Sequence, residues 1–385
     1  MNYRLVLLSA GHLVTDINQG ALPALLPFLI SEYHLSYAAA GVIIFSANIV
    51  ATIVQPLFGY LADRISSPWL MPAGIVLAGV GMGATGVVSG YGWVLMCVML
   101  SGIGVAAFHP QGAMAVNRIS GERKAMAMSF FGVGGTVGYG LGPVIVTTAL
   151  LFFGLKGTVV LAIPVSILAV VLLQELASGD GTHTPKDRQP TVTPNGDARD
   201  DWGAFSRLTG VVVARAVLSY GFNTFIPLYW INVLHQSKAA GALTLTVFAL
   251  SSIAGTLLGG RLADYLGHTW VTIAGSCAQI PLVPLLLVAP TPAAAMPVLV
   301  MLGVCIAVTY SPLIVLGQRY LPHRTGLSSG VTLGVAVTIG GVAIPILGRV
   351  ADHSGLSMTF AVLGIVPVIA AGLALSLPQP KRRRC

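Results

Sequence analysis

The sequence predicts an all-α membrane protein with twelve transmembrane helices, arranged as two pseudo-symmetric six-helix bundles. Three observations predict this fold class: the composition, the length of the apolar runs and an internal repeat. Hydrophobic residues make up 55% of the 385 residues, charged residues make up 8%, and the mean hydropathy is +0.85. Soluble domains carry about 25% charged residues. The composition therefore indicates a chain in lipid, where a spanning backbone must satisfy its hydrogen bonds within helices or a closed barrel.

The apolar runs decide between helices and a barrel. They are about 20–25 residues long, as spanning helices are, whereas barrel strands alternate over roughly ten residues. Six spans are expected in each half: 5–31, 37–62, 69–89, 92–117, 125–153, 155–176, 207–233, 240–263, 269–289, 294–318, 325–349 and 356–377. The first run is too long for a signal-peptide core and lacks a small-residue cleavage pattern, so a retained span is expected.

The chain divides between the sixth and seventh runs. Residues 178–203 are rich in proline, glycine and charge, which is the composition of a flexible linker. We therefore expect an N-terminal six-helix bundle at 1–177, a cytoplasmic linker at 178–203, a C-terminal six-helix bundle at 204–378 and a basic cytoplasmic tail at 379–385.

The two halves repeat each other at an offset near 201 residues. The stretch Gly59-Tyr60-Leu61-Ala62-Asp63-Arg64 reappears as Gly260-Arg261-Leu262-Ala263-Asp264-Tyr265, each after the second span of its half. At a slightly different offset, Phe108-His109-Pro110 falls on Tyr310-Ser311-Pro312. Parallel repeats of this kind are typical of transporters whose substrate site lies near the bilayer midplane between the halves.

The basic residues behind the net charge of +8 are concentrated on one side of the membrane. With twelve spans, the loops on one side hold 16 of the 20 basic residues, including Lys381-Arg382-Arg383-Arg384. The other side holds Lys156, Lys238 and Arg349, and Arg215 lies within a span. This asymmetry follows the positive-inside rule and predicts that both termini and the central loop lie in the cytoplasm. The orientation of the chain in the membrane also explains the excess of basic residues, so no nucleic-acid partner is expected.

The cysteines and the absence of catalytic patterns exclude several function classes. Cys97, Cys277, Cys305 and Cys385 are scattered, and no pair has metal-ligand or redox spacing. No nucleophile–base set is recognisable either. We therefore expect a protein that is not an enzyme and that has no cofactor, no metal and no disulfide framework.

Polar residues inside the first span are the main candidates for function. His12 and Asp16 are four residues apart and share a helix face, and Gln19 lies three residues further on the same side. A carboxylate at the centre of a spanning helix costs about 2.5–3.5 kcal/mol on insertion scales, so it usually faces a bundle interior or a wet cavity. His109 in the fourth span lies about 13 Å along the helix from Arg118, in the middle third of the membrane.

Two histidines and one carboxylate at this depth suggest proton coupling. Histidine changes charge near neutral pH most easily, although a lone histidine in a helix is more often a packed, hydrogen-bonded residue. Desolvated carboxyl groups in a cavity can also titrate in the physiological range. We expect Asp16, with His109 and His12, to carry the coupling proton.

Arg215 is the only basic residue deep in a predicted span, and it lies in the seventh span, the repeat partner of the first. An unpaired guanidinium there is costly, so it must meet a carboxylate, a carbonyl cluster or water. Two alternatives follow: Arg215 pairs with Asp16, or its planar fork receives an anionic substrate. The side chains expected to line a substrate site are Arg215, Gln19, Asp16, Phe108, Gln111, Tyr139, Phe222 and Tyr310.

Two further motifs bear on conformational change. Asp63 ends the second span, where it can pair with a neighbouring helix start or basic residue and latch one conformation; its repeat at Asp264 argues against a plain loop aspartate. In the fifth span, glycines at four-residue spacing form a ridge for close helix packing, and a proline adds a bend. The residues expected to take part in gating are Asp63, Arg64, Asp264, Arg118, Arg123, Gly142 and Pro143.

The chain resembles the fosmidomycin resistance family of the major facilitator superfamily over nearly its whole length outside the linker. The residues that carry the resemblance are His12-Leu13 with Asp16 and Gln19, Gln55-Pro56, Gly59-Tyr60, Pro68-Trp69, Phe108-His109-Pro110, Gly134-Gly135, Leu141-Gly142-Pro143, Gly326 with Ser329-Gly330, and Ala351-Asp352-His353. The resemblance implies the major facilitator fold and inner-membrane efflux of small toxic compounds driven by inward proton flow. One departure is Gln111, which stands where the family carries glutamate.

These observations predict a proton-coupled efflux antiporter for small toxic or drug-like compounds, some of them anionic, that works by alternating access as a monomer. Its expected partners are a small-molecule substrate, protons and the lipid bilayer. One alternative is a proton-coupled uptake symporter for a carboxylate or lipid-like metabolite. A second is a non-transporting membrane sensor or scaffold, which the short polar linker at 178–203 disfavours.

Overall fold

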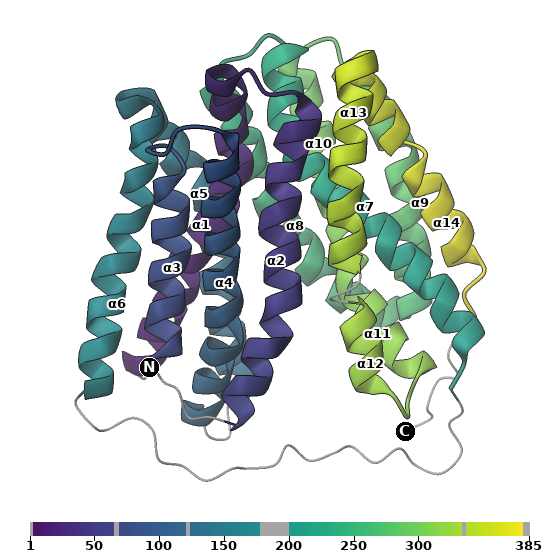
Figure 1. The fold of residues 1–385 in the computed structure, drawn as a ribbon. Helices are drawn as coiled ribbons and strands as arrows, with labels where there is room; N and C mark the ends of the chain where they lie inside the picture. Colours follow the sequence, from purple (N-terminus) through teal and green to yellow (C-terminus); the bar gives the residue numbers. More distant parts are fainter. Residues whose placement is uncertain (1–2, 65–68, 121–123, 178–199, 333–335, 380–385) are drawn as a thin grey trace. The chain divides into compact units, whose positions relative to one another are not determined.

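The structure is a computed structural model that describes residues 3–64, 69–120, 124–177, 200–332 and 336–379 (Figure 1). These residues form helices joined by short turns, and the described part of the chain contains no strand. By length and composition, nine described stretches are apolar enough to cross a membrane. The predicted all-α membrane class is therefore confirmed.

The predicted number of twelve spans stays a prediction, because some of these stretches hold more than one expected span. Met126–Glu175 is counted once although it contains the predicted spans 125–153 and 155–176. The helix Leu70–Ala84 is apolar but falls short of the length that the criterion requires.

The helices follow the apolar runs of the sequence closely. In the first half they are α1 (Tyr3–Tyr33), α2 (Tyr37–Arg64), α3 (Leu70–Ala84), α4 (Tyr91–Ile119), α5 (Lys124–Phe153), the 3-10 helix η1 (Gly154–Leu161) and α6 (Ala162–Ala177). Gly90 and Gly154 have φ values of 98° and 59°, which side chains with a Cβ rarely adopt. They permit the sharp turns into α4 and η1.

The second half begins at a capped helix. It contains α7 (Trp202–Asn232), α8 (Lys238–Leu266), α9 (His268–Leu287), α10 (Pro292–Ala307), α11 (Tyr310–Tyr320), α12 (Thr325–Gly330), α13 (Ala336–Leu363) and α14 (Val366–Leu375). The Asp201 side chain accepts a hydrogen bond from the amide of Ala204 and so caps α7. Inside α13, Gly355 has a φ of 83°, and this break separates the last two predicted spans.

The chain forms two compact units. Unit 1 contains residues 1–187 and 237–246, and unit 2 contains residues 188–236 and 247–385. The predicted bundle and linker boundaries stay predictions, because most of the predicted linker lies outside the described residues.

Unit 1 is organised around α1, which packs mainly against α5 and also contacts α3 and α4. Gly134, Gly138 and Gly142 of α5 lie against the backbone carbonyls of Ser9, Leu13 and Ile17 of α1, in that order. A methyl group at any of the three glycines would overlap the facing backbone. The four-residue glycine spacing therefore acts as a packing ridge that brings two parallel helix backbones together.

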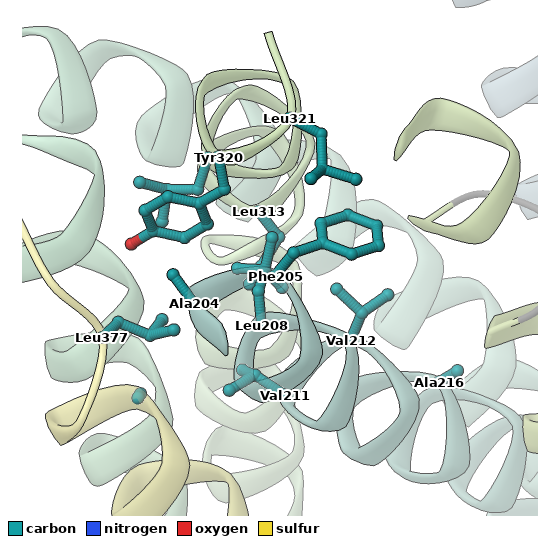
Figure 2. Packing of buried hydrophobic residues seen from close by; sticks show 12 residues of the cluster. Ala204, Phe205, Leu208, Val211, Val212, Ala216, Leu313, Tyr320, Leu321 and Leu377 are labelled. Carbon is teal, nitrogen blue, oxygen red and sulfur yellow. The ribbon is translucent and has the colours of Figure 1, made fainter. Parts of the chain in front are cut away.

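Unit 2 has its own core, in which α7 packs against α11, α13 and α14. Figure 2 shows apolar side chains of the first turns of α7, among them Phe205 and Leu208, facing Leu313 and Tyr320 of α11. The Tyr320 hydroxyl donates to the carbonyl of Pro378 at 2.7 Å, and the amide of Asp201 donates to the carbonyl of Tyr320 at 2.8 Å. These bonds tie the start of α7 to the ends of α11 and of the described chain.

Candidate functional site

Three of the predicted site residues meet inside unit 1. Nε2 of His12 lies 3.3 Å from Oδ2 of Asp16, and Nε2 of His109 lies 3.2 Å from Oδ1 of the same carboxylate. The side chains of His12 and Asp16 are each 13% exposed, and that of His109 is 23% exposed. We refer to these three residues as the His–Asp–His cluster. It joins α1 to α4 at a place that is largely but not completely closed.

The hydrogen bonds of the two imidazoles fix their tautomers. Nδ1 of His12 lies 2.8 Å from the carbonyl oxygen of Phe131, and Nδ1 of His109 lies 2.9 Å from that of Val105. A carbonyl oxygen only accepts, so each Nδ1 carries a hydrogen and donates it. Each Nε2 therefore faces Asp16 either with a lone pair, when the ring is neutral, or with a second hydrogen, when the ring is charged. Only the charged ring can donate to the carboxylate.

Aromatic packing and one glycine hold the cluster in place. The His12 ring stacks on Phe131 of α5, with ring centroids 4.2 Å apart, and it makes an edge contact with the His109 ring at 5.0 Å. Phe108 and Phe131 are buried beside it. A Cβ at Gly135 would lie 2.7 Å from Oδ2 of Asp16 and would overlap the His12 ring. The backbone of α5 therefore forms one wall of the cluster.

Arg215 forms a second polar feature, in unit 2. Its guanidinium carbon lies 4.6 Å from the centre of the Tyr310 ring, a cation–π arrangement. Its Nε atom is buried and has no hydrogen-bond partner, and the side chain makes no ion pair with any described residue. A buried guanidinium in this state has unused donors, and an anion is the natural acceptor for them. The sequence-based choice between Asp16 and substrate as its partner stays open.

The two features are related by the internal repeat. In unit 1, Asp16 of α1 contacts His109, part of the Phe-His-Pro element of α4. In unit 2, Arg215 of α7 contacts Tyr310, part of the repeated Tyr-Ser-Pro element of α11. Each half therefore carries one charged residue on its first helix, held against the same proline-containing element.

The other predicted substrate residues occupy different environments. Gln19, Gln111 and Tyr139 are partly buried, and Nε2 of Gln111 has no hydrogen-bond partner among the described residues. Phe222 is fully buried and packs against Phe248 and Phe360 in the core of unit 2. Substrate contact by these residues, as by Phe108, stays a prediction.

The predicted gating residues are only partly visible. The side chains of Asp63 and Arg64, and all of Arg123, lie outside the described residues. Arg118 and Asp264 are exposed near the ends of α4 and α8. In α5, Gly142 contacts the backbone of α1 and the neighbouring Pro143 is buried. Their part in gating stays a prediction.

Two contributors to the cluster were not predicted as site residues, Phe131 and Gly135. Both belong to α5, and both act through backbone or ring contact rather than through a charge. The glycine spacing of α5 could have indicated Gly135. Where glycines let two helix backbones approach closely, side chains of one helix can also lie directly against the backbone of the other.

The helical units and their polar clusters within spanning helices are typical of a multi-pass membrane transporter. The family model of the Major Facilitator Superfamily matches residues 8–345, and the chain belongs to this superfamily. Its substrate is accordingly a small molecule.

Three known proteins illustrate the similarity. The chain is 28% identical to the uncharacterized MFS-type transporter YfnC of Bacillus subtilis (strain 168), over 99% of this chain and 94% of that protein. It is also 28% identical to the fosmidomycin resistance protein of Escherichia coli (strain K12), over 98% and 93%. Among solved structures, a bacterial homologue of the human lysosomal transporter Spinster superposes with a TM-score of 0.81 at 16% identity, over 97% and 96%. The predicted resemblance is confirmed, and the last comparison shows the shared fold alone.

Proposed function

We propose that this protein is a proton-coupled antiporter of the bacterial inner membrane that exports small toxic or drug-like compounds by alternating access. The observation that carries the proposal is the His–Asp–His cluster, which places two titratable rings against one carboxylate inside a membrane span. The similarity to a fosmidomycin resistance protein supports export as the direction. We further propose that the protein acts as a monomer with both termini in the cytoplasm.

The coupling step follows from the tautomers of the two histidines. When both rings are neutral, two lone pairs face the Asp16 carboxylate and the cluster has a net charge of −1. When both Nε2 atoms are protonated, each donates to the carboxylate and the net charge is +1. A proton that reaches His109 from the outside therefore joins α4 to α1 more tightly, and its loss to the cytoplasm weakens this contact; His12 and Asp16 both lie on α1. Histidine is suited to this exchange because it titrates near neutral pH.

Arg215 is the proposed substrate contact. Its unused donors and its stacking on Tyr310 fit a ligand with an anionic group and an apolar body. We propose that proton uptake by the cluster favours release of this ligand, so that protonation of the cluster and binding of the ligand at Arg215 alternate. Gln19, Gln111 and Tyr139 of unit 1, all partly buried, are proposed as further polar substrate contacts.

The test is transport in proteoliposomes with an imposed pH gradient. Fosmidomycin is the first compound to try, followed by compounds that raise the unfolding temperature of the purified protein. An antiporter accumulates external substrate when the lumen is acidic, because protons leaving the vesicle drive the exchange. A symporter, the uptake alternative, accumulates it when the exterior is acidic. If the substrate flux is the same with an acidic lumen, an acidic exterior and no pH gradient, transport is not coupled to protons.

A further inference from the structure

We propose that the His–Asp–His cluster is a binding site for a divalent transition-metal ion of the zinc type. His12 and His109 each offer a ring nitrogen and Asp16 offers a carboxylate oxygen, and these atoms all lie within 4.8 Å of one another. The inference concerns the residues of the proposed coupling site, but it is a separate property that can be measured without transport.

The spacing of the three groups suits a tetrahedral ion. Zinc binds histidine nitrogen and carboxylate oxygen at about 2.0–2.2 Å, which places neighbouring ligand atoms of a tetrahedron roughly 3.3–3.5 Å apart. The two nitrogen–oxygen separations in the cluster are 3.3 and 3.2 Å. The two rings face different oxygens of Asp16, so the side chains must rotate to bring one oxygen and both nitrogens around a single ion.

The outer hydrogen bonds of the histidines are those of metal ligands. A ligating histidine commonly donates its other ring N–H to a backbone carbonyl or carboxylate, which fixes the tautomer and directs the remaining lone pair at the metal. His12 donates in this way to Phe131, and His109 donates to Val105. When the two rings are neutral, both Nε2 lone pairs therefore point toward the Asp16 carboxylate. The lone pairs and the carboxylate repel each other unless a proton or a metal ion lies between them.

The donor set selects the class of ion. Imidazole favours zinc, copper, nickel and iron, whereas magnesium and calcium prefer sites made only of oxygen. The described residues supply no fourth His, Cys, Asp or Glu ligand at this place, so one coordination position is left for water or a small anion. At Gly135 the backbone of α5 packs directly against His12 and Asp16, so the fourth position must lie on another side of the cluster.

A divalent ion and two protons are electrically equivalent here. With both histidines charged the cluster has a net charge of +1, and one divalent ion on two neutral histidines and Asp16 also leaves +1. Outside the cluster, the described side chains in ring contact with its histidines are Phe108 and Phe131, which carry no charge. Metal and protons must therefore compete, and metal affinity falls as the pH is lowered.

The test is metal titration of the purified full chain in detergent. Zn²⁺ is followed by calorimetry and Co²⁺ by its visible absorption, at pH 7.5 and 5.5. The wild-type chain is expected to bind one ion, more weakly at the lower pH. The variants His12→Gln, His109→Gln and Asp16→Asn are expected to lose about 100-fold in affinity, at least as much as loss of an outer hydrogen bond costs a metal site.

The matched control is His353→Gln. His353 also donates Nδ1 to a backbone carbonyl four residues earlier, that of Arg349 at 2.9 Å, but it is exposed and distant in sequence from the cluster. This variant must keep full affinity. Unchanged binding in the double variant His12→Gln/His109→Gln would overturn the site. If a variant aggregates, the wild-type chain still tests the proposal. A Co²⁺ spectrum of the wild-type chain that lacks the strong bands of a four-coordinate ion would also overturn the metal site.

The outcomes separate this inference from the proposed function. Saturable metal binding without pH-driven flux leaves the metal site standing and removes proton coupling. If the chain shows flux driven by a pH gradient but binds no metal, proton coupling stands and the metal site is ruled out. If both hold, Zn²⁺ is expected to inhibit the wild-type protein and to inhibit it less at pH 5.5.

Discussion

Nε2 of His109 lies 3.2 Å from Oδ1 of Asp16, and this contact joins α4 to α1 inside the first half of the transporter. Because Nδ1 of His109 is committed to the carbonyl of Val105, the contact is attractive only when Nε2 carries a proton. The same holds for His12, one helical turn before Asp16. Because His12 and Asp16 both lie on α1, the packing of α4 against α1 depends on the charge of the His109 ring.

Substitution of Gly135 by alanine is expected to disturb the cluster without a change of any charged group. The added methyl group meets the His12 ring and the Asp16 carboxylate, and overpacking of this kind costs about 1–3 kcal/mol. We expect pH-driven transport to fall by about tenfold, the equivalent of about 1.4 kcal/mol. Gly132→Ala is the control in the same helix, because its added methyl group would have no atom within 4 Å. Equal effects of the two substitutions would argue against the cluster.

Removal of the His109 ring is expected to change how transport depends on pH. In the wild-type protein the rate should respond to pH, because the contact of His109 with Asp16 is attractive only when the His109 ring is protonated. His109→Ala should flatten this response, while His353→Ala, at an exposed position, should leave it intact. The initial rate is measured between pH 5 and pH 8. If His109→Ala and the wild-type protein give the same profile, His109 serves packing only.

Truncation of Arg215 is expected to discriminate between substrates by charge. Arg215→Ala removes donors that no described residue satisfies, so an anionic compound should lose affinity by about tenfold or more, equivalent to about 1.4 kcal/mol. A cationic compound should change little. Arg215→Lys keeps the charge but loses the planar fork that stacks on Tyr310, and it should fall between the two. Equal losses for anionic and cationic compounds would assign Arg215 a structural role.

A stability prediction concerns the joint between α3 and η1. The buried Thr158 hydroxyl donates to the carbonyl of Gly83 at 2.7 Å and accepts from the amide of Gly86 at 3.1 Å. Thr158→Val leaves both backbone groups buried without this partner, at a cost of about 1–3 kcal/mol each. Thermal unfolding in detergent should report a lower midpoint. Thr136→Val, which affects an exposed hydroxyl bonded within its own helix, should shift the midpoint far less.

Much of the fold was predictable because lipid leaves the backbone few choices. Long apolar runs with charged ends locate the helices, and each predicted span overlaps at least one helix in the described residues. The interruptions were harder to predict. The break between α10 and α11 falls at Val308 and Thr309 inside one continuous apolar run, and η1 adopts 3-10 geometry after Gly154. These depend on how the segments pack, which the hydropathy of single residues does not report.

The site was predictable as a set of residues but not as a geometry. The four-residue spacing of His12 and Asp16 places them on one face of a helix, and the depth of His109 in its own helix matches theirs. That His109 reaches the same carboxylate depends on the packing of α4 against α1, a tertiary contact. The stacking of His12 on Phe131 and the wall at Gly135 depend likewise on the α1–α5 junction.

The most direct test of the central claim is pH-driven flux through the Asp16→Asn variant in proteoliposomes. Asparagine preserves the shape of the side chain but removes the charge that both histidines face. The account predicts that the variant keeps its folded structure, as judged by a monodisperse elution profile and an unfolding transition. It should still exchange labelled substrate across the membrane, and it should lose accumulation driven by a pH gradient. Undiminished pH-driven accumulation by a folded Asp16→Asn protein would contradict the account.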